Sequence, residues 1–296
     1  VYELGKLSMQ EFFDDVDREI SFSSPLREKL GHHFFGEEWA NQIKTTLWEN
    51  NLYDKEIHIV SANLHSVMNS IYAIGALKSK VKGKTLEDIA VELSGSSTNR
   101  VKVRDYAFAN GMYELYNQSG TNISVQVIDC GKIKASQLPD ELGSAIDAEN
   151  LDSKVIIVMD YAFGEQAYET MDELLKPYKF EGEKHDLNVA SINIMGKAGI
   201  LEGKKGDIMI ATAHIFEGSA DNYPVKNDLK TSDFKGNGLG VYEGPMITVL
   251  GTSLQNRDIL SYFLLSSWQA IGLEMEGAHY QKAIQAASQI RKNVSP

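Results

Sequence analysis

The sequence predicts an α/β protein whose mainly parallel or mixed sheet is flanked by helices. Short apolar runs typical of strands alternate with segments of helical periodicity along the whole chain. Residues 154–159 form a continuous apolar run of the kind that is buried in parallel sheets. A turn that contains Gly164 joins this run to a helical segment, which Pro177 ends. The alternation and these junctions together indicate the α/β class.

The composition argues against nucleic-acid and membrane partners. The chain has 296 residues, of which 43% are hydrophobic and 24% charged, which is typical of a globular protein. The net charge of −12 repels phosphate backbones, so we expect no nucleic-acid partner. No apolar run reaches the roughly 20 residues that a membrane helix needs, so we expect no membrane partner. The single cysteine, Cys130, fits a cytoplasmic protein and follows an apolar run, where we expect it to be buried rather than nucleophilic.

The N-terminal half, residues 1–150, is predicted to form an α/β region of its own. Its first helix covers residues 9–19, because Ser8 and Glu11 have the spacing of a capping box. Further helices are predicted over residues 37–50, 65–78, 85–93, 103–116 and 137–147, and strands over 56–62 and 121–129. Nothing in this half indicates a particular chemistry, so its role stays open.

The C-terminal half, residues 151–296, repeats the alternation. Strands are predicted over residues 154–159, 187–195, 207–212, 245–250 and 272–275, and helices over 165–175, 255–270 and 278–291. Residues 217–242 are rich in polar residues and glycine and are predicted to form a long loop. Ligands of such sheets bind beyond the carboxyl ends of the strands. The residues that follow each strand are therefore the candidates for function.

Three strand ends carry motifs. They are Met159-Asp160-Tyr161-Ala162-Phe163-Gly164-Glu165, then Gly196-Lys197-Ala198-Gly199 with Gly206-Asp207-Ile208-Met209 after it, and Glu274-Met275-Glu276-Gly277-Ala278. Each has an ordinary structural explanation when it is taken alone. The glycines suit a tight turn, and a glutamate at the start of a helix complements the helix dipole.

Taken together and in this order, the motifs resemble those of the purine nucleoside phosphorylase and nucleosidase superfamily. The resemblance covers roughly residues 154–291 and implies a mixed sheet flanked by helices, preceded by an extra N-terminal region as in AMP nucleosidases. It implies that Glu276 binds the ribose hydroxyls, that Met275 packs on the ribose, and that Glu165 positions the attacking water. The remaining substrate-binding positions that we carry over or place nearby are Glu274, Gly196, Lys197, Ala198, Gly199 and His214.

The chemistry of ribosyl transfer explains these residue types. Cleavage of the bond between the sugar and the base builds positive charge on the sugar, as in glycoside hydrolysis. A carboxylate that accepts hydrogen bonds from the sugar hydroxyls holds the ring and lies near the developing cation. The resemblance implies a purine nucleoside or nucleotide as the small-molecule partner and requires no cofactor or metal.

One departure from the family favours water over phosphate as the nucleophile. Phosphorylases of this superfamily hold phosphate with an arginine two residues before the glycine turn and with a serine or threonine inside it, where this chain has Ile194 and Lys197. We therefore expect an N-ribosyl hydrolase that acts on a purine nucleoside or a nucleotide such as AMP. Lys197 either pairs with a substrate 5′-phosphate or is a solvated turn residue. The alternatives are a phosphorylase, that is, a glycosyltransferase that uses inorganic phosphate, and a non-catalytic nucleotide-binding protein.

A second departure concerns the general acid, which the family places on a strand after the Met-Glu helix. The sequence ends at Pro296, where that strand is expected to begin. We therefore expect the catalytic region to be truncated here and the acid to lie beyond Pro296. The resemblance also implies a homo-oligomer, because the family assembles its sites near subunit contacts.

Overall fold

The computed structural model describes residues 2–14, 34–78, 81, 83–116, 119–139, 142, 148–234, 236, 238–251, 256–265 and 269–295. The chain divides into two compact units, Val1–Phe34 and Phe35–Pro296. The described element of the first unit is helix α1 (Tyr2–Asp14). Ser8 lies inside this helix, so the predicted cap at Ser8 is wrong. Residues 15–19 of the predicted helix lie outside the described residues.

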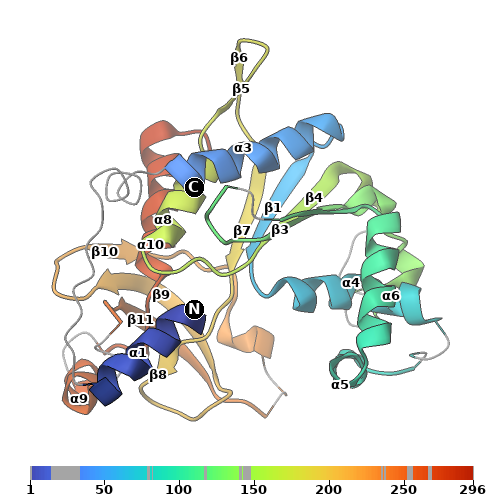
Figure 1. Cartoon of the computed structure of the whole chain (residues 1–296). Helices are drawn as coiled ribbons and strands as arrows, with labels where there is room; N and C mark the ends of the chain where they lie inside the picture. The colour runs from blue at the N-terminus through green and yellow to red at the C-terminus, as the bar shows by residue number, and fades with distance from the viewer. Residues whose placement is uncertain are drawn as a thin grey trace. The chain divides into compact units, whose positions relative to one another are not determined.

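The larger unit contains a five-stranded mixed sheet in the order β2-β3-β4-β1-β7 (Figure 1). Its strands are β1 (Glu56–Ser61), β2 (Met112–Leu115), β3 (Val125–Asp129), β4 (Lys154–Met159) and β7 (Val189–Ile194). Strand β1 runs parallel to β4 and β7, whereas β3 and β2 form an antiparallel edge. Strands from both sides of residue 150 therefore lie in one sheet. The division of roles between residues 1–150 and 151–296 stays a prediction.

Helices cover both faces of this sheet. Helices α3 (Phe34–Glu49), α8 (Gln166–Leu174) and α10 (Gly277–Gln285) contribute to one hydrophobic core, and α4 (Leu64–Leu77), α5 (Leu86–Gly95) and α6 (Ser97–Ala109) contribute to another. Ile157 belongs to the first core and its neighbour Val158 to the second, because successive residues of a strand face opposite sides. The result is a layered α/β/α arrangement.

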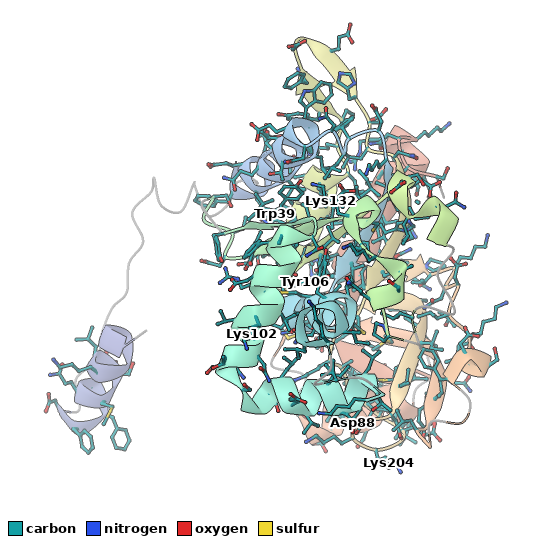
Figure 2. All side chains as sticks on the ribbon, turned by 90° about the vertical axis from the view of Figure 1, so that its right-hand side faces the viewer. Trp39, Asp88, Lys102, Tyr106, Lys132 and Lys204 are labelled. Atoms are coloured by element: carbon teal, nitrogen blue, oxygen red, sulfur yellow. The ribbon has the colours of Figure 1, made fainter. Side chains whose placement is uncertain are left out.

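Close helix packing on the second face depends on a glycine. A Cβ added at Gly75 of α4 would lie 2.8 Å from the ring of Tyr106 on α6. Figure 2 labels Tyr106 where α6 meets α4, and it labels Lys102, an exposed residue of the same helix. Because Gly75 has no side chain, helices α4 and α6 can approach each other closely. Tyr106 and Tyr72 of α4 then form an edge-to-face pair, with ring centroids 6.5 Å apart.

The helix predicted over residues 103–116 is displaced toward the C-terminus: it begins six residues after Ser97, the start of helix α6, and runs seven residues past its end. Helix α6 ends at Ala109, and β2 begins at Met112. Gly111 between them has a φ of +95°, and a Cβ there would lie 2.8 Å from the Cβ of Lys132. The chain therefore turns at a position that only glycine fits. Of the helix predicted over residues 137–147, positions 140, 141 and 143–147 lie outside the described residues.

A second five-stranded sheet has the order β10-β9-β11-β12-β8. Its strands are β8 (Gly199–Ile200), β9 (Ile208–Phe216), β10 (Asn222–Pro224), β11 (Val241–Thr248) and β12 (Gly272–Glu274), with α9 (Arg257–Leu265) before β12. Strand β11 is parallel to β9 and β12, and the two edge strands are antiparallel. The loop predicted over residues 217–242 contains β10 and a short 3₁₀ turn at Thr231–Phe234. A hairpin of β5 (Tyr178–Phe180) and β6 (Glu183–His185) completes the unit.

The predicted α/β class with mixed sheets is confirmed. Cys130 is 3% exposed and follows β3, so its predicted burial is also confirmed. Burial raises the pKa of the Cys130 thiol to about 11, as expected for an unreactive side chain. In the part of the chain that the structure describes, no helix has the length and apolar character needed to cross a membrane.

Candidate active site

The three strand-end motifs meet beside the start of α10. Strands β4, β1 and β7 are parallel, so their carboxyl ends share one edge of the first sheet. At that edge the backbone N–H of Met195 donates to the carbonyl of Ser61 over 2.9 Å. The Ser61 hydroxyl is hydrogen-bonded to the hydroxyl of Tyr280 on α10 over 3.1 Å. The end of α10 that carries Glu276 is thereby tied to the position where ligands of α/β sheets bind.

Glu276 links the third motif to the first. Its Oε1 accepts a hydrogen bond from the backbone N–H of Gly164 over 3.0 Å. The side chain is half-buried, and burial raises the pKa of Glu276, although the Gly164 N–H bond opposes the shift. A partly desolvated carboxylate interacts more strongly with hydroxyl donors and with positive charge than a solvated one does. Such a group suits a sugar ring that becomes cationic.

Glu165 follows Gly164 and is exposed at the start of α8. Its side chain makes no capping hydrogen bond to that helix, so capping does not account for it. Because its neighbour binds Glu276, the structure brings the two predicted catalytic carboxylates into one region. Glu165 and Glu274 also act electrostatically on His279, opposing the loss of its proton.

Glu274 is buried, and both of its oxygens are used inside the protein. Oε1 accepts from the Thr248 hydroxyl and lies 3.2 Å from Nδ1 of His214, and Oε2 accepts from the backbone N–H groups of Glu276, over 2.6 Å, and Gly277. Burial alone would raise the pKa of Glu274, but the bonds from His214, Thr248 and Gly277 outweigh it and hold the pKa below its usual range. The carboxylate satisfies free N–H groups at the start of α10. We therefore interpret its contacts as support for Glu276 rather than as a sugar site.

His214 is held between β9 and the start of α10. A Cβ added at Gly277 would lie 2.1 Å from Nδ1 of His214, so the imidazole rests directly on that glycine. Tyr223 of β10 is the ladder partner of His214, and Phe216 follows two residues later on the same face of β9. The Phe216 ring lies 5.9 Å from Tyr223 and 4.8 Å from His279, in edge-to-face arrangements. These rings form a partly buried aromatic surface beside the third motif.

His279 was not predicted as a site residue. It lies three positions after Glu276 and therefore on a neighbouring face of α10. Burial lowers the pKa of His279, and the negative charges of Glu165 and Glu274 oppose that shift. The helical spacing from Glu276 was a usable signal in the sequence.

The glycine turn contributes through its last residue. Gly199 pairs with Leu273 of β12, the residue before Glu274. Gly196 and Lys197 are exposed, and Ala198 is half-buried. Met275 packs partly against the small core of the second sheet, and its Cε would lie 3.3 Å from a Cβ at Gly251. The structure thus places Gly199 and Met275 next to the two glutamates, whereas the Lys197 side chain extends into solvent.

Among the residues that the structure describes, no three His, Cys, Asp or Glu side chains gather in a way that could hold a metal ion.

Comparisons with known proteins give similar folds and one family. No curated protein matches. Among solved structures, the chain is similar to futalosine hydrolase of Helicobacter pylori, with 14% identity over 78% of this chain and 81% of that chain and a TM-score of 0.44. It is similar to 5′-methylthioadenosine/S-adenosyl homocysteine nucleosidase of Campylobacter jejuni, with 11% identity over 78% and 80% of the two chains and a TM-score of 0.42.

AMP nucleosidase of Bacteroides thetaiotaomicron is similar at 13% identity, over 86% of this chain and 85% of that chain, with a TM-score of 0.40. The model of a family of unknown function, DUF6909, matches residues 91–295, which is well over half of the sequence. The chain belongs to this family of unknown function.

Proposed function

We propose that the protein is an N-ribosyl hydrolase that cleaves the glycosidic bond of a purine nucleoside or of a nucleotide such as AMP. The observation that carries the proposal is the 3.0 Å hydrogen bond from Gly164 to Glu276. It links Glu276 to the segment that carries Glu165, beside the carboxyl ends of the parallel strands β4, β1 and β7. Paired carboxylates in different surroundings are the usual equipment for cleaving a bond to a sugar carbon.

The two carboxylates have different tasks in this proposal. Glu276, which is half-buried, accepts hydrogen bonds from the ribose hydroxyls and lies near the positive charge that builds on the sugar. Met275 offers an apolar surface to the ring. Glu165, which is exposed, takes a proton from the attacking water, since a solvated carboxylate without a capping partner is available as a base.

Water rather than phosphate is the proposed nucleophile. The exposed Ile194 side chain and Lys197 occupy the positions at which the phosphorylases hold phosphate. An aliphatic side chain cannot donate a hydrogen bond to phosphate. Lys197 is proposed to attract a 5′-phosphate on the substrate, as a flexible point charge does.

A product assay tests the proposal. The protein is incubated with AMP, adenosine, inosine and methylthioadenosine, each with and without inorganic phosphate, and the base and sugar products are separated by chromatography. We expect free base with ribose or ribose 5-phosphate, independent of phosphate. Ribose 1-phosphate that forms only with phosphate would instead establish a phosphorylase. Binding without release of base would establish a nucleotide-binding protein.

A further inference from the structure

We propose that His214 donates the proton to the departing base and that Glu274 orients its imidazole for this step. This role replaces the expectation that the general acid lies beyond Pro296. The inference rests on the proposed nucleosidase function and assigns one more role in it. A purine leaves more easily when a ring nitrogen is protonated, because the base then departs without carrying a negative charge. The proton must come from a group that lies beside the sugar site and that has a defined orientation.

The hydrogen bond between His214 and Glu274 fixes that orientation. Nδ1 of His214 lies 3.2 Å from Oε1 of Glu274, whose side chain is 9% exposed. An ionised carboxylate only accepts hydrogen bonds, so Nδ1 carries a hydrogen and Nε2 is the nitrogen that gains and loses a proton. The other bonds to Glu274 come from Thr248 and from backbone N–H groups and keep the carboxylate ionised and in place. A buried carboxylate that holds a histidine in one tautomer is a recurring device for proton transfer.

The position of His214 relative to Glu276 supports a direct role. The imidazole rests on Gly277, the residue after Glu276, at a distance that leaves no room for a Cβ. The His214 side chain is 15% exposed, so it is largely buried but still accessible to a ligand. We therefore expect a sugar bound to Glu276 and Met275 to direct its base toward this ring.

The neighbours of His214 suit a purine. Tyr223 lies opposite it in the ladder between β9 and β10, and Phe216 shares its face of β9. Both rings are partly buried and contact each other, as do Phe216 and His279. Flat, partly exposed aromatic faces bind flat bases by stacking. This aromatic surface would hold the base against the Nε2 edge of His214.

Nε2 of His214 gives its proton to a ring nitrogen of the base while the bond between C1′ and the base breaks, and the bonding electron pair stays with the base. Water adds to C1′, and its proton goes to Glu165. Solvent then returns a proton to His214 and removes one from Glu165, so the protein ends as it began.

His279 is a weaker candidate for this role. Its ring packs edge-to-face against Phe216 at 4.8 Å. Burial lowers the pKa of His279, which disfavours the protonated form that a general acid needs. It is better suited to shaping the aromatic surface.

The test compares two leaving groups. The first substrate is the purine nucleoside or nucleotide that the wild-type protein cleaves, and the second is the matching 4-nitrophenyl riboside, whose leaving group departs without a proton. His214→Asn and His214→Gln are each measured on both. We expect kcat/KM on the purine substrate to fall about 10²- to 10⁴-fold, the range of general acid catalysis. On the nitrophenyl riboside we expect a change of only a few-fold.

Controls separate this proposal from the proposed function. His185→Gln is the matched histidine control, because the His185 ring packs against Trp48. His185 belongs to β6, and the β5–β6 hairpin lies away from β9 and β11 (Figure 1). Glu276→Ala should lose activity on both substrates. A wild-type protein that cleaves neither substrate would overturn the nucleosidase function itself.

Two outcomes overturn the role of His214 alone. They are equal losses on both substrates in the folded variants, and unchanged activity on both. If the His214 variants do not fold, Glu274→Gln decides. An amide can donate to Nδ1 and shift the hydrogen to Nε2, so the same split between the two substrates is expected. An equal effect of Glu274→Gln on both substrates contradicts the proposal.

Discussion

In the sheet β2-β3-β4-β1-β7, helices pack on both faces and every residue of β3 is buried, whereas most of β9 in the second sheet is only half-buried. The first sheet joins two extensive hydrophobic cores. Among the described residues, the buried members of the second sheet's core are Ile215, Ile247, Val249, Ala270 and Leu273. In the second sheet, hydrogen bonds among polar side chains add to this small apolar core. They join Glu274 to Thr248 and to His214.

Stability and the proposed chemistry depend on different sheets. Apolar burial in the first sheet supplies most of the free energy of folding. The polar network of the second sheet fixes the geometry of a small region. Helix α10 joins the two, because Tyr280 and Ala283 pack in the first core while Glu274 holds the start of the helix. Substitutions in the polar network should therefore lower activity more than stability. Substitutions in the cores of the first sheet should lower stability more than activity.

Among the changes that compare the two sheets, Glu276→Ala is expected to lower activity most. Removing a group that interacts with a developing charge costs about 10²- to 10³-fold in turnover. We expect base release to fall by at least this factor with little change in Tm, because Glu276 belongs to neither core of the first sheet. Chromatography of free base and thermal unfolding are the measurements. Glu38→Ala, an exposed residue of α3, is the matched control. Retained activity in Glu276→Ala would contradict the assigned ribose contact.

Gly277→Ala should affect both activity and stability. The new Cβ would lie 2.1 Å from Nδ1 of His214 and 2.8 Å from Oε1 of Glu274, so the network must shift. Overpacking of this kind costs about 1–3 kcal/mol of stability, and we expect activity to fall more than ten-fold. Gly95→Ala is the control, because no atom of the residues that the structure describes lies within 4 Å of a Cβ there. Denaturant unfolding and turnover are measured for both variants. Wild-type activity in Gly277→Ala would show that His214 and Glu276 are not coupled.

Lys44 tests the other side of the comparison. Its Nζ is buried under α8 and donates to the carbonyls of Glu173 and Lys176, over 2.7 and 2.8 Å. Burial lowers the pKa of Lys44 from its ordinary value of 10.5 to about 8. The unfolded chain therefore binds more protons between these values, and the free energy of unfolding rises with pH. Below pH 8 the side chain is charged in both states, and this contribution is absent.

Between pH 7.5 and 9.5 we expect a gain of roughly 2 kcal/mol in the wild-type protein that Lys44→Met lacks. Denaturant unfolding at a series of pH values measures it. Lys44→Met should also be less stable at every pH in this range, since two carbonyls lose their donor. Activity per folded molecule should stay unchanged. Parallel pH profiles for the two proteins would show that Lys44 does not titrate in this window.

The sequence predicts the first sheet better than the second. The helices and strands around β1, β4 and α8 have enough residues to display a period, and their predicted bounds agree closely with the structure. Strands β5, β6, β8 and β10 have two or three residues each, too few for any period, and they were missed. The break at Gly111 was missed because it depends on a close approach by Lys132.

The site was predictable as residue types but not as an arrangement. Glu276 and Glu165 stand out because they follow strands. Their proximity depends on a hydrogen bond between residues 112 positions apart, which no local pattern encodes. The bond from Thr248 to Glu274 joins positions 26 apart in the same way. This bond is one of the contacts by which we interpret Glu274, which was predicted to bind substrate, as a support for the start of α10.

The smallest expected effect concerns Lys197. Its side chain is exposed, so any pairing with a 5′-phosphate is weakened by solvent and by salt. We expect Lys197→Ala to raise KM for AMP a few-fold and to leave KM for adenosine unchanged, and the difference to shrink as salt is added. Lys179→Ala, an exposed lysine of the β5–β6 hairpin, removes the same charge elsewhere and should change neither KM. Equal effects of Lys197→Ala on both substrates would mean that the charge acts on the protein rather than on a phosphate. The glycine turn would then serve only to hold β8 against β12.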